Sequence, residues 1–406
     1  MVESKRKLIF LWNYVEWGGA QVYLLAVMKQ AREEFDITVA LPRDSMPDIF
    51  RFLDALGIRY DLRDVSLDMN AAPGIVRKLR RQWRRIKTEA STFRYLLKYD
   101  LSRSILHIET APWQSWILLA ALALRRSNTF LTMHNIMPRA SGLRELIWRL
   151  RLRAVSRLPR FHIFASNNDT KNGLKAWVTN RFFEEIKVTY TAVDPAEIEQ
   201  ASAAAFDRDA ERRAFGIRPH AFVVLCVGQF IDRKGRWVFL EAASKAVAAN
   251  DNISFIWLSP NAPNKQESDR IDSFKLGDKF RHILSADVGH DRHSILRYFR
   301  IADAFALASY VEGLPIALLE AMAMGLPSVS TNINAIPEAI IPEKTGLLIE
   351  PGDAGALCDA ILRLDRDPDL RSRLATEGKE YVLKHFDERR VADSIIDSYN
   401  EALGRI

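Results

Sequence analysis

The chain has 406 residues, of which 48% are hydrophobic and 27% are charged. This composition is typical of a globular protein, and the length favours two or more domains over one. No segment reaches the roughly 18 consecutive apolar residues of a membrane-spanning helix, because the longest candidate, WILLAALAL from Trp116, stops at Arg125. Cys226 and Cys358 have no metal-binding or disulfide spacing, so we expect both to be buried packing residues.

Charge is divided unevenly along the chain. The net charge of +7 is the sum of +13 for residues 1–195, with 32 basic and 19 acidic side chains, and −6 for the remainder, with 26 and 32. We therefore expect the basic half to face an anionic partner or surface.

The first apolar run superficially resembles a secretory signal, because KRK at residues 5–7 precedes LIFLWNYV. The run is short, however, and EWGG at residues 16–19 stands where a small-residue cleavage site would follow. We interpret the run as a first buried strand and expect a cytoplasmic protein.

Over the first half of the chain, short β-rich apolar runs alternate with amphipathic helical patterns such as Gln21–Glu34 and Ile49–Leu56. This alternation predicts a parallel sheet covered by helices on both faces. The expected strands are Leu8–Trp12, Ile37–Leu41, Ile105–Ile108, Thr129–Met133, Phe161–Ala165 and Ile186–Tyr190.

The second half repeats this alternation. Val193–Gly216 is polar and alanine-rich, which is typical of a linker, and Ser259–Gly277 carries two prolines, which is typical of a surface loop. Apolar residues recur at helical spacing over Asp387–Leu403. The expected elements are strands Ala221–Val227, Ile253–Leu258, Ala304–Leu307 and Ser328–Thr331, and helices Trp237–Ala249, Ile295–Phe299 (as part of a helix) and Ile316–Met324.

The expected fold is α/β, with two doubly wound parallel-sheet domains facing each other across a cleft. The first domain would cover residues 1–192 and the second residues 193–384. Residues 385–406 would form a C-terminal helix that packs back on the first domain.

One stretch of the second half, EGLPIALLEAMAMG, combines two carboxylates with a helix start. Pro315 suits the first helical turn and Gly325 suits the stop, so Glu312 would precede the helix and Glu320 would lie about a turn and a half inside it. A phosphate at the helix end, with carboxylates accepting hydroxyl hydrogen bonds, would suit a sugar diphosphate. The alternative is that Glu320 lies on the surface of an ordinary helix. The N–H groups at the helix end belong to Gly313, Leu314, Ile316 and Ala317.

Around these residues the chain resembles the family 4 retaining glycosyltransferases of the GT-B fold, whose best signature is a pair of glutamates separated by seven residues, here Glu312 and Glu320. The pair lies in ADAFALASYVEGLPIALLEAMAMGLPSVS. Further matches, in the family's order, are WGGAQVYLLAVM, LTMHN, VGQFIDRKG and TGLLIEPGD. The resemblance spans nearly the whole chain and is weakest over residues 64–103. It implies two Rossmann-like domains.

The resemblance also implies an activity, namely transfer of a sugar from a nucleotide-diphosphate sugar to a hydroxyl acceptor with retention of configuration. The protein would be a hexosyltransferase without a metal or other cofactor. His134 would lie at the reacting sugar face, and Glu312 would bind hydroxyls of the donor sugar. Taken alone, His134 would more often be a core histidine, and the motif context reverses that preference.

The resemblance assigns the nucleotide and the phosphates to other residues. Glu320 would bind the ribose hydroxyls, and Lys234 would neutralise the diphosphate, aided by the amides around Gly313 to Ala317. Gly18 and Gly19 would let the backbone approach the donor phosphates and the acceptor closely, since no side chain intervenes.

The chain departs from the family's pattern most seriously at Gln229, where an arginine usually follows the glycine of VGQF. One cation beside the diphosphate is then missing, and Arg233 is a candidate to replace it. The change leaves open an altered donor, weaker catalysis or a lost activity. Two other departures, Ala308 for proline and Thr191 for asparagine, concern local geometry.

Two basic stretches of the first half carry apolar residues at helical spacing. Ile75 to Lys98 holds nine Lys or Arg and one acid, and a second stretch runs from Gly142 to Phe161. Such a pattern is typical of a helix on an anionic membrane surface, so we expect a peripheral protein on the cytoplasmic face of the inner membrane. The alternative is a pair of solvated helices packed on the sheet.

The expected acceptor is a glycan or lipid-linked saccharide of surface-polysaccharide synthesis. Alternatives are a nucleotide-sugar epimerase or phosphorylase on the same fold, or a catalytically degenerate GT-B module that binds a membrane or an anionic polymer. Nucleic acid is not an expected partner, because no recognised nucleic-acid motif accompanies the basic stretches.

Overall fold

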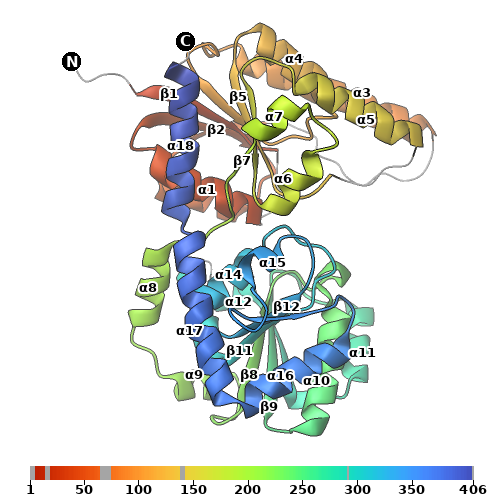
Figure 1. The fold of residues 1–406 in the computed structure, drawn as a ribbon, viewed down its shortest axis with the longest axis vertical. Helices are drawn as coiled ribbons and strands as arrows, with labels where there is room; N and C mark the ends of the chain where they lie inside the picture. The colour runs from red at the N-terminus through yellow and green to blue at the C-terminus, as the bar shows by residue number, and fades with distance from the viewer. Residues whose placement is uncertain (1–4, 14–18, 65–74, 138–141, 290–291, 405–406) are drawn as a thin grey trace. The chain divides into compact units, whose positions relative to one another are not determined.

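The computed structural model describes residues 5–13, 19–64, 75–137, 142–289 and 292–404 (Figure 1). The chain divides into two compact units. Unit 1 comprises residues 1–190 and 389–406, and unit 2 comprises residues 191–388. The expected boundaries were at residues 192 and 384.

Unit 1 contains a seven-stranded sheet in the described residues, with order β3-β2-β1-β4-β5-β6-β7 and parallel pairing throughout. Because β1 is central, the chain builds the sheet first toward β3 and then, from β4, in the opposite direction. Side chains that follow β1 and β4 therefore lie where an open parallel sheet binds ligands, at its switch point. The strands are β1 (Arg6–Leu11), β2 (Phe35–Pro42), β3 (Arg59–Arg63), β4 (Ile105–Ile108), β5 (Asn128–Met133), β6 (Phe161–Ala165) and β7 (Lys187–Val188).

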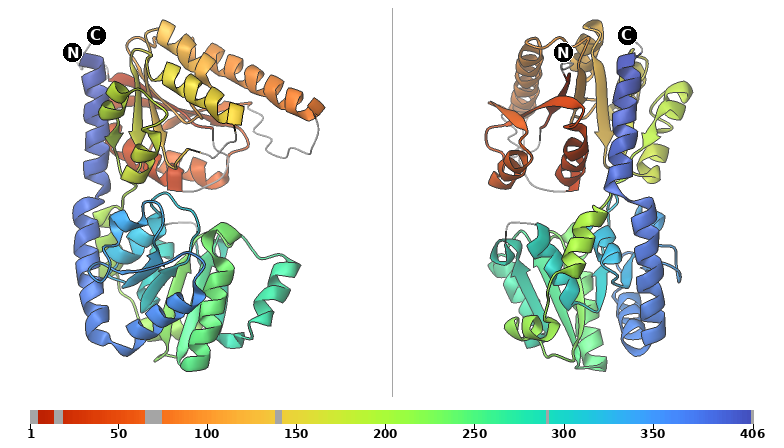
Figure 2. Two further views of the ribbon diagram at one scale, coloured as in Figure 1. Left: turned by 45° about the vertical axis from the view of Figure 1, so that its right-hand side comes forward. Right: turned by 90° about the vertical axis from the view of Figure 1, so that its left-hand side faces the viewer.

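Helices cover both faces of this sheet, and alternate residues of β1 face opposite sides. Leu8 and Phe10 join the core beneath α1, α2 and α18, whereas Ile9 and Leu11 join the core beneath α3 to α7. Through Ile395 the C-terminal helix α18 packs on unit 1 beside α1 (Figure 2). The helices are α1 (Gly19–Ala31), α2 (Pro47–Ala55), α3 (Ile75–Leu96), α4 (Trp116–Leu124), α5 (Gly142–Val155), α6 (Asn168–Leu174), α7 (Asn180–Glu185) and α18 (Glu388–Gly404).

Unit 2 repeats the topology with a six-stranded parallel sheet among its described residues, in the order β10-β9-β8-β11-β12-β13. Its first strand, β8, is again central, so the switch point lies between β8 and β11. The strands are β8 (Phe222–Val227), β9 (Ile253–Ser259), β10 (Phe280–Leu284), β11 (Ala304–Leu307), β12 (Ser328–Thr331) and β13 (Leu347–Ile349).

The helices of unit 2 pack in pairs beside its sheet. Helix α10 packs against α16, α14 packs against α17, and α13 packs against α8 and α9. Among the helices of the described residues, none is both long and apolar enough to cross a bilayer. The helices are α8 (Pro195–Ala203), α9 (Arg208–Ala214), α10 (Arg236–Ala249), α11 (Lys265–Ser273), α12 (Ser285–Val288), α13 (Arg292–Ile301), α14 (Ile316–Ala323), α15 (Ile336–Ala339), α16 (Ala354–Arg366) and α17 (Pro368–His385).

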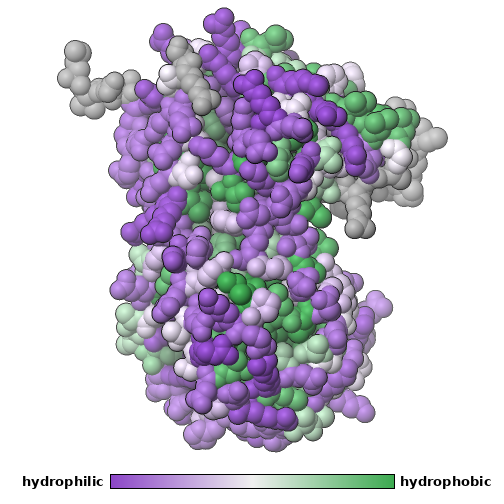
Figure 3. Space-filling model, in the orientation of Figure 1, coloured by the Kyte–Doolittle hydropathy of each residue, from purple (hydrophilic) through white to green (hydrophobic). Residues whose placement is uncertain are grey.

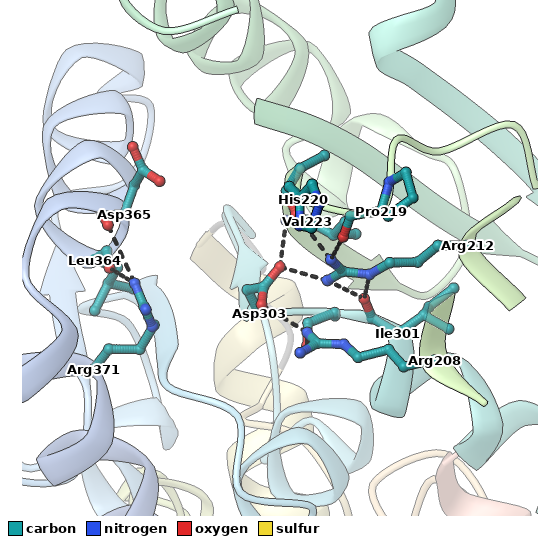
Figure 4. A network of polar contacts seen from close by, with 12 residues as sticks. Arg208, Arg212, Pro219, His220, Val223, Ile301, Asp303, Leu364, Asp365 and Arg371 are labelled. Carbon is teal, nitrogen blue, oxygen red and sulfur yellow. Dashed lines mark hydrogen bonds and ion pairs between the residues drawn. The ribbon is translucent and has the colours of Figure 1, made fainter. Parts of the chain in front are cut away.

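The expected linker, Val193–Gly216, is wrong, because it contains α8 and α9. The buried Arg212 holds α9 to the sheet: its guanidinium donates to Ile301 O at 2.7 Å and to Asp303 Oδ2 at 2.6 Å (Figure 4). Asp303 also accepts from Val223 N at 2.8 Å, so one carboxylate joins α9, β8 and the residue before β11. Arg212, which lies within the expected linker, is thus a buried and fully paired anchor of α9.

The expected surface loop, Ser259–Gly277, is also wrong over part of its length, because α11 lies inside it. Asn264 and Glu267 form a reciprocal capping box at its start. The helix has no buried residue, so its sequence lacks the apolar periodicity on which the expectation depended.

Candidate functional site

Two loops meet at the switch point of unit 2. After β8 the chain turns through Gly228 and the 3₁₀ turn Asp232–Lys234 into α10, and after β11 it continues toward α14. Gly235 has φ +70°, and a Cβ there would lie 1.8 Å from the carbonyl oxygen of Ala308. Only glycine fits this contact, so the backbones of the two loops can pack directly against each other.

The centre of this site is a largely buried ion pair between Lys234 and Glu312. Lys234 Nζ lies 2.6 Å from Glu312 Oε1, and the two side chains are 14% and 6% exposed. Ser309 Oγ donates to the same oxygen at 2.6 Å, and Asn334 Oδ1 accepts from Glu312 N at 3.3 Å. The resemblance assigns Lys234 to the diphosphate and Glu312 to the sugar hydroxyls. These two side chains contact each other, and the contact positions both charges.

A second cation lies beside the pair. Arg233 Nη1 is 3.7 Å from Glu312 Oε2 and donates to Val311 O at 3.0 Å, and its side chain is 45% exposed. Gln229, which follows β8, is partly buried. Arg233 thus lies near the carboxylate on the side of the pair that solvent can reach.

Helix α14 supplies the remaining predicted residues of unit 2. It begins at Ile316, as expected, and Pro315 is its N-cap, which offers no side-chain hydrogen bond to the first turn. The amides of Ile316 and Ala317 belong to that turn, where intrahelical acceptors do not exist. Gly313 and Leu314 lie on the loop before it. Glu320 is buried, so the alternative that it is a surface residue is wrong.

In unit 1, His134 follows β5 and its side chain is 15% exposed. Its Nε2 lies 3.7 Å from Oε2 of Glu109, a buried carboxylate directly after β4 that the sequence analysis missed. Glu109 could have been found from the sequence, because it directly follows a buried parallel strand, where ligand-binding side chains lie. His107, which the prediction did not include, lies 3.6 Å from the other oxygen of Glu109.

The glycine-rich turn of unit 1 is described in part. Gly19 is exposed and opens α1, and a Cβ there would meet nothing within 4 Å. Gly18 lies outside the described residues. His134 also contacts α1, since its ring and that of Tyr23 pack in a T-shaped arrangement with the centroids 5.2 Å apart.

Comparison with known proteins finds a family match over most of unit 2. Residues 207–381, which include Lys234, Glu312 and Glu320, match the family model "Glycosyl transferases group 1". The chain is similar to the D-inositol 3-phosphate glycosyltransferase of Saccharomonospora viridis, with 28% identity over 204 residues, 48% of this chain and 46% of that protein. It is also similar to the lipopolysaccharide core biosynthesis glycosyltransferase LpsD of Rhizobium meliloti, with 27% identity over 186 residues, 46% of this chain and 51% of that protein.

The chain spans about half the length of these curated relatives. Its fold matches solved structures over almost its whole length. Anabaena Alr3699/HepE, crystallised with UDP and glucose, aligns with a TM-score of 0.76 and 19% identity, covering 98% of this chain and all of that chain. The two Rossmann-like parallel-sheet units and these neighbours define a GT-B fold.

Proposed function

We propose that the protein is a retaining glycosyltransferase, which moves a hexosyl group from a nucleotide-diphosphate sugar to a hydroxyl acceptor without a metal. The observation that carries the proposal is the buried Lys234–Glu312 pair beside the first turn of α14, within the segment that matches the family model. The names of the curated relatives support the activity. UDP and glucose in the HepE crystal make UDP-glucose the first donor to test.

The chemistry follows from the charges. Breaking a glycosyl–phosphate bond leaves negative charge on the diphosphate, and a preorganised ammonium and N–H donors stabilise that charge. Lys234 and the first-turn amides of α14 would supply them, with Arg233 at the solvent side. Because Lys234 and Arg233 are cations and the amides are oriented N–H donors, the proposed step needs no divalent cation. Glu312 would accept hydrogen bonds from the donor sugar, Glu320 from the ribose, and His134 would face the reacting sugar.

The test of the donor site is calorimetric titration of UDP, GDP, ADP, TDP and CDP without metal. We expect one nucleotide to bind at micromolar strength, and Glu320→Ala to weaken it by about 1–3 kcal/mol, the range for a hydrogen bond to a charged group. Glu241→Ala is the matched control, because Glu241 is an exposed glutamate of α10 paired with Lys245. If no nucleotide binds, or if Glu320→Ala binds equally well, the degenerate-module alternative replaces the transferase.

The acceptor side of the proposal depends on the surface of α3, α4 and α5. Helix α4 packs against both α3 and α5, and apolar residues are interspersed with hydrophilic ones over this face (Figure 3). Trp148, Leu152 and Val155 of α5 pack into the core, so packing on the sheet explains one side of the helix. It does not explain the exposed apolar side chains, which are Trp83, Ile86, Ile117, Leu124, Leu143, Leu146, Ile147 and Leu150.

The charge of this face favours an anionic partner. Only two acids, Glu89 and Glu145, lie within the three helices, and both are paired with arginines. Exposed apolar side chains among cations are typical of a helix that lies in the headgroup region of an anionic bilayer. The proposed acceptor is therefore a lipid-linked saccharide of surface-polysaccharide synthesis, reached at the cytoplasmic face of the inner membrane. The exposed basic residues are Arg84, Lys87, Arg94, Arg125, Arg126, Arg144, Arg149, Arg153 and Arg157.

Flotation with lipid vesicles tests this surface. We expect binding to phosphatidylglycerol vesicles that weakens with salt, and little binding to phosphatidylcholine. The double variant Leu146→Asp, Leu150→Asp should lose roughly tenfold or more, because burying one leucine contributes about 1.5–3 kcal/mol. Met46→Asp is the control, since Met46 is an exposed apolar residue before α2. Equal binding by the double variant would contradict the membrane partner and leave the donor site untouched.

A further inference from the structure

A buried polar network in unit 1 contains a carboxylate to which the proposed function gives no role. Glu109 is the first residue after β4, at the switch point of the sheet, and is almost fully buried. Its backbone oxygen accepts from Asn13 Nδ2 at 2.9 Å, which ties the ends of β1 and β4 together. Its two carboxylate oxygens face different imidazoles.

The two imidazoles differ in how they are held. His107 is fully buried, and its Nδ1 lies 2.5 Å from Tyr399 Oη of α18 while its Nε2 lies 3.0 Å from Thr132 Oγ1. It also stacks on Phe10, with the ring centroids 5.4 Å apart. His134 has partial access to solvent, and its buried Nε2 faces Glu109. Glu109 thus lies between a fixed histidine and the histidine that the proposed function puts at the sugar.

We infer that Glu109 is a positioning residue for His134. Its carboxylate accepts the Nε2–H of His134, fixes the ring's orientation and tautomer, and leaves Nδ1 as the nitrogen available to a bound sugar. The separation of 3.7 Å is longer than a hydrogen bond, as catalytic hydrogen bonds often are before substrate binds, and at this distance the carboxylate still favours the tautomer whose N–H faces it. The catalytic part of this inference rests on the proposed function, whereas the tautomer does not.

The electrostatics of the network support a permanent carboxylate. Burial alone would raise the pKa of Glu109, but the adjacent His107 and His134 outweigh it and lower that pKa to about 2. Among the described residues, Tyr23 of α1 and Tyr399 of α18 also interact electrostatically with Glu109, and burial raises the pKa of each. Both tyrosines are therefore neutral at physiological pH, and Glu109 is the acceptor that stays charged.

Histidine-labelled protein without ligand gives the direct test. Nitrogen-15 NMR of the ring should show neutral His134 as the Nε2–H tautomer in the wild type, and as a mixture in Glu109→Met, which removes both acceptor oxygens at similar volume. Glu109→Gln keeps one acceptor oxygen and should restore the wild-type tautomer in part. His134→Asn assigns the signals, and thermal unfolding shows that each variant is folded.

Kinetics supply the second readout. With the nucleotide sugar found by calorimetry, Glu109→Met should lower kcat by about tenfold or more with less than about a twofold change in KM, and Glu109→Gln should recover part of the loss. Glu185→Gln is the control, because Glu185 is an exposed carboxylate of α7 in the same unit, paired with Arg181. An unchanged His134 tautomer in Glu109→Met overturns the inference. Absence of transfer by the wild type overturns the proposed function instead, and the tautomer remains measurable.

Discussion

The two units place different charge chemistry at the carboxyl ends of neighbouring central strands of their parallel sheets. In unit 2, the loops after β8 and β11 bring an ammonium and a carboxylate to hydrogen-bond distance, with 2.6 Å between Lys234 and Glu312. In unit 1, residues after β4 and β5 bring a carboxylate and an imidazole to 3.7 Å, with Glu109 and His134. A lysine keeps its charge across the physiological range, which suits a phosphate, whereas an imidazole changes protonation and tautomer, which suits a sugar hydroxyl.

The largest effect is expected at Lys234, because the proposed role of the unit 2 pair depends on its ammonium group. Lys234→Met should lower the transfer rate by roughly 10²–10³-fold, as removal of one preorganised donor to a developing oxyanion does. It also leaves Glu312 buried without its closest cation. Steady-state transfer assays measure the loss. Lys245→Met, on the exposed side of α10, should retain full activity. Near-normal transfer by Lys234→Met would show that the unit 2 pair is structural.

The turns into the first helix of each unit allow a second contrast, between Gly235 and Gly19. Gly235→Ala combines a positive φ with a clash against Ala308 O, and should cost at least about 2 kcal/mol of the free energy of unfolding. Gly19→Ala meets open space and should change it by less than about 0.5 kcal/mol. Urea unfolding measures both. If Gly19→Ala is stable but binds the donor or the acceptor more weakly, the close approach of the backbone at Gly19 is supported. Unchanged affinities for both would contradict it.

Sequence patterns predicted the central strands well, for a physical reason. Strands buried on both faces consist of continuous apolar residues, and Ile105–Ile108, Phe161–Ala165, Ala304–Leu307 and Ser328–Thr331 have the expected bounds. The edge strands β3 and β10 were missed, because RYDLR and FRHIL are partly exposed and carry charges. Both cysteines are buried as expected.

The candidate site was predictable as a set of residues but not as a set of contacts. The glutamate pair and Lys234 could be chosen from their motifs, whereas their approach depends on a glycine contact between loops 73 positions apart, at Gly235 and Ala308. Glu109 carries no motif at all. Its environment comes from β4, β5 and the distant helix α18, which places Tyr399 in the network 292 residues from His107.

A smaller effect is expected at Arg233. This side chain tests whether unit 2 compensates for Gln229, which stands where the resemblance leads us to expect an arginine. The side chain of Arg233 is 45% exposed, so solvent and salt screen its charge. Arg233→Ala should raise KM for the nucleotide sugar by about 3–10-fold and leave kcat within about threefold, and Gln229→Arg in that background should restore part of the affinity. An additive, independent response of the two positions would contradict the replacement.

The smallest expected effect is on the pH dependence of stability, which should differ between two carboxylates of unit 1, Glu109 and Glu89. The pKa of Glu109 in the folded protein is about 2, below the ordinary value near 4.3, so its contribution to stability is present above that ordinary value and is lost as pH falls toward 2. Glu109→Gln should therefore lose less stability than the wild type between pH 5 and pH 3, by at most about 1.4 kcal/mol per pH unit.

Glu89 should show the opposite sign. Burial raises the pKa of Glu89, so in the wild type this group takes up a proton more readily when folded and opposes acid unfolding. Glu89→Gln removes that effect and should make the loss of stability with acid steeper. Urea midpoints measured at several pH values compare the three proteins. Parallel curves would mean that neither carboxylate titrates differently on folding, and the contrast between the charge chemistry of the two units would then rest on geometry alone.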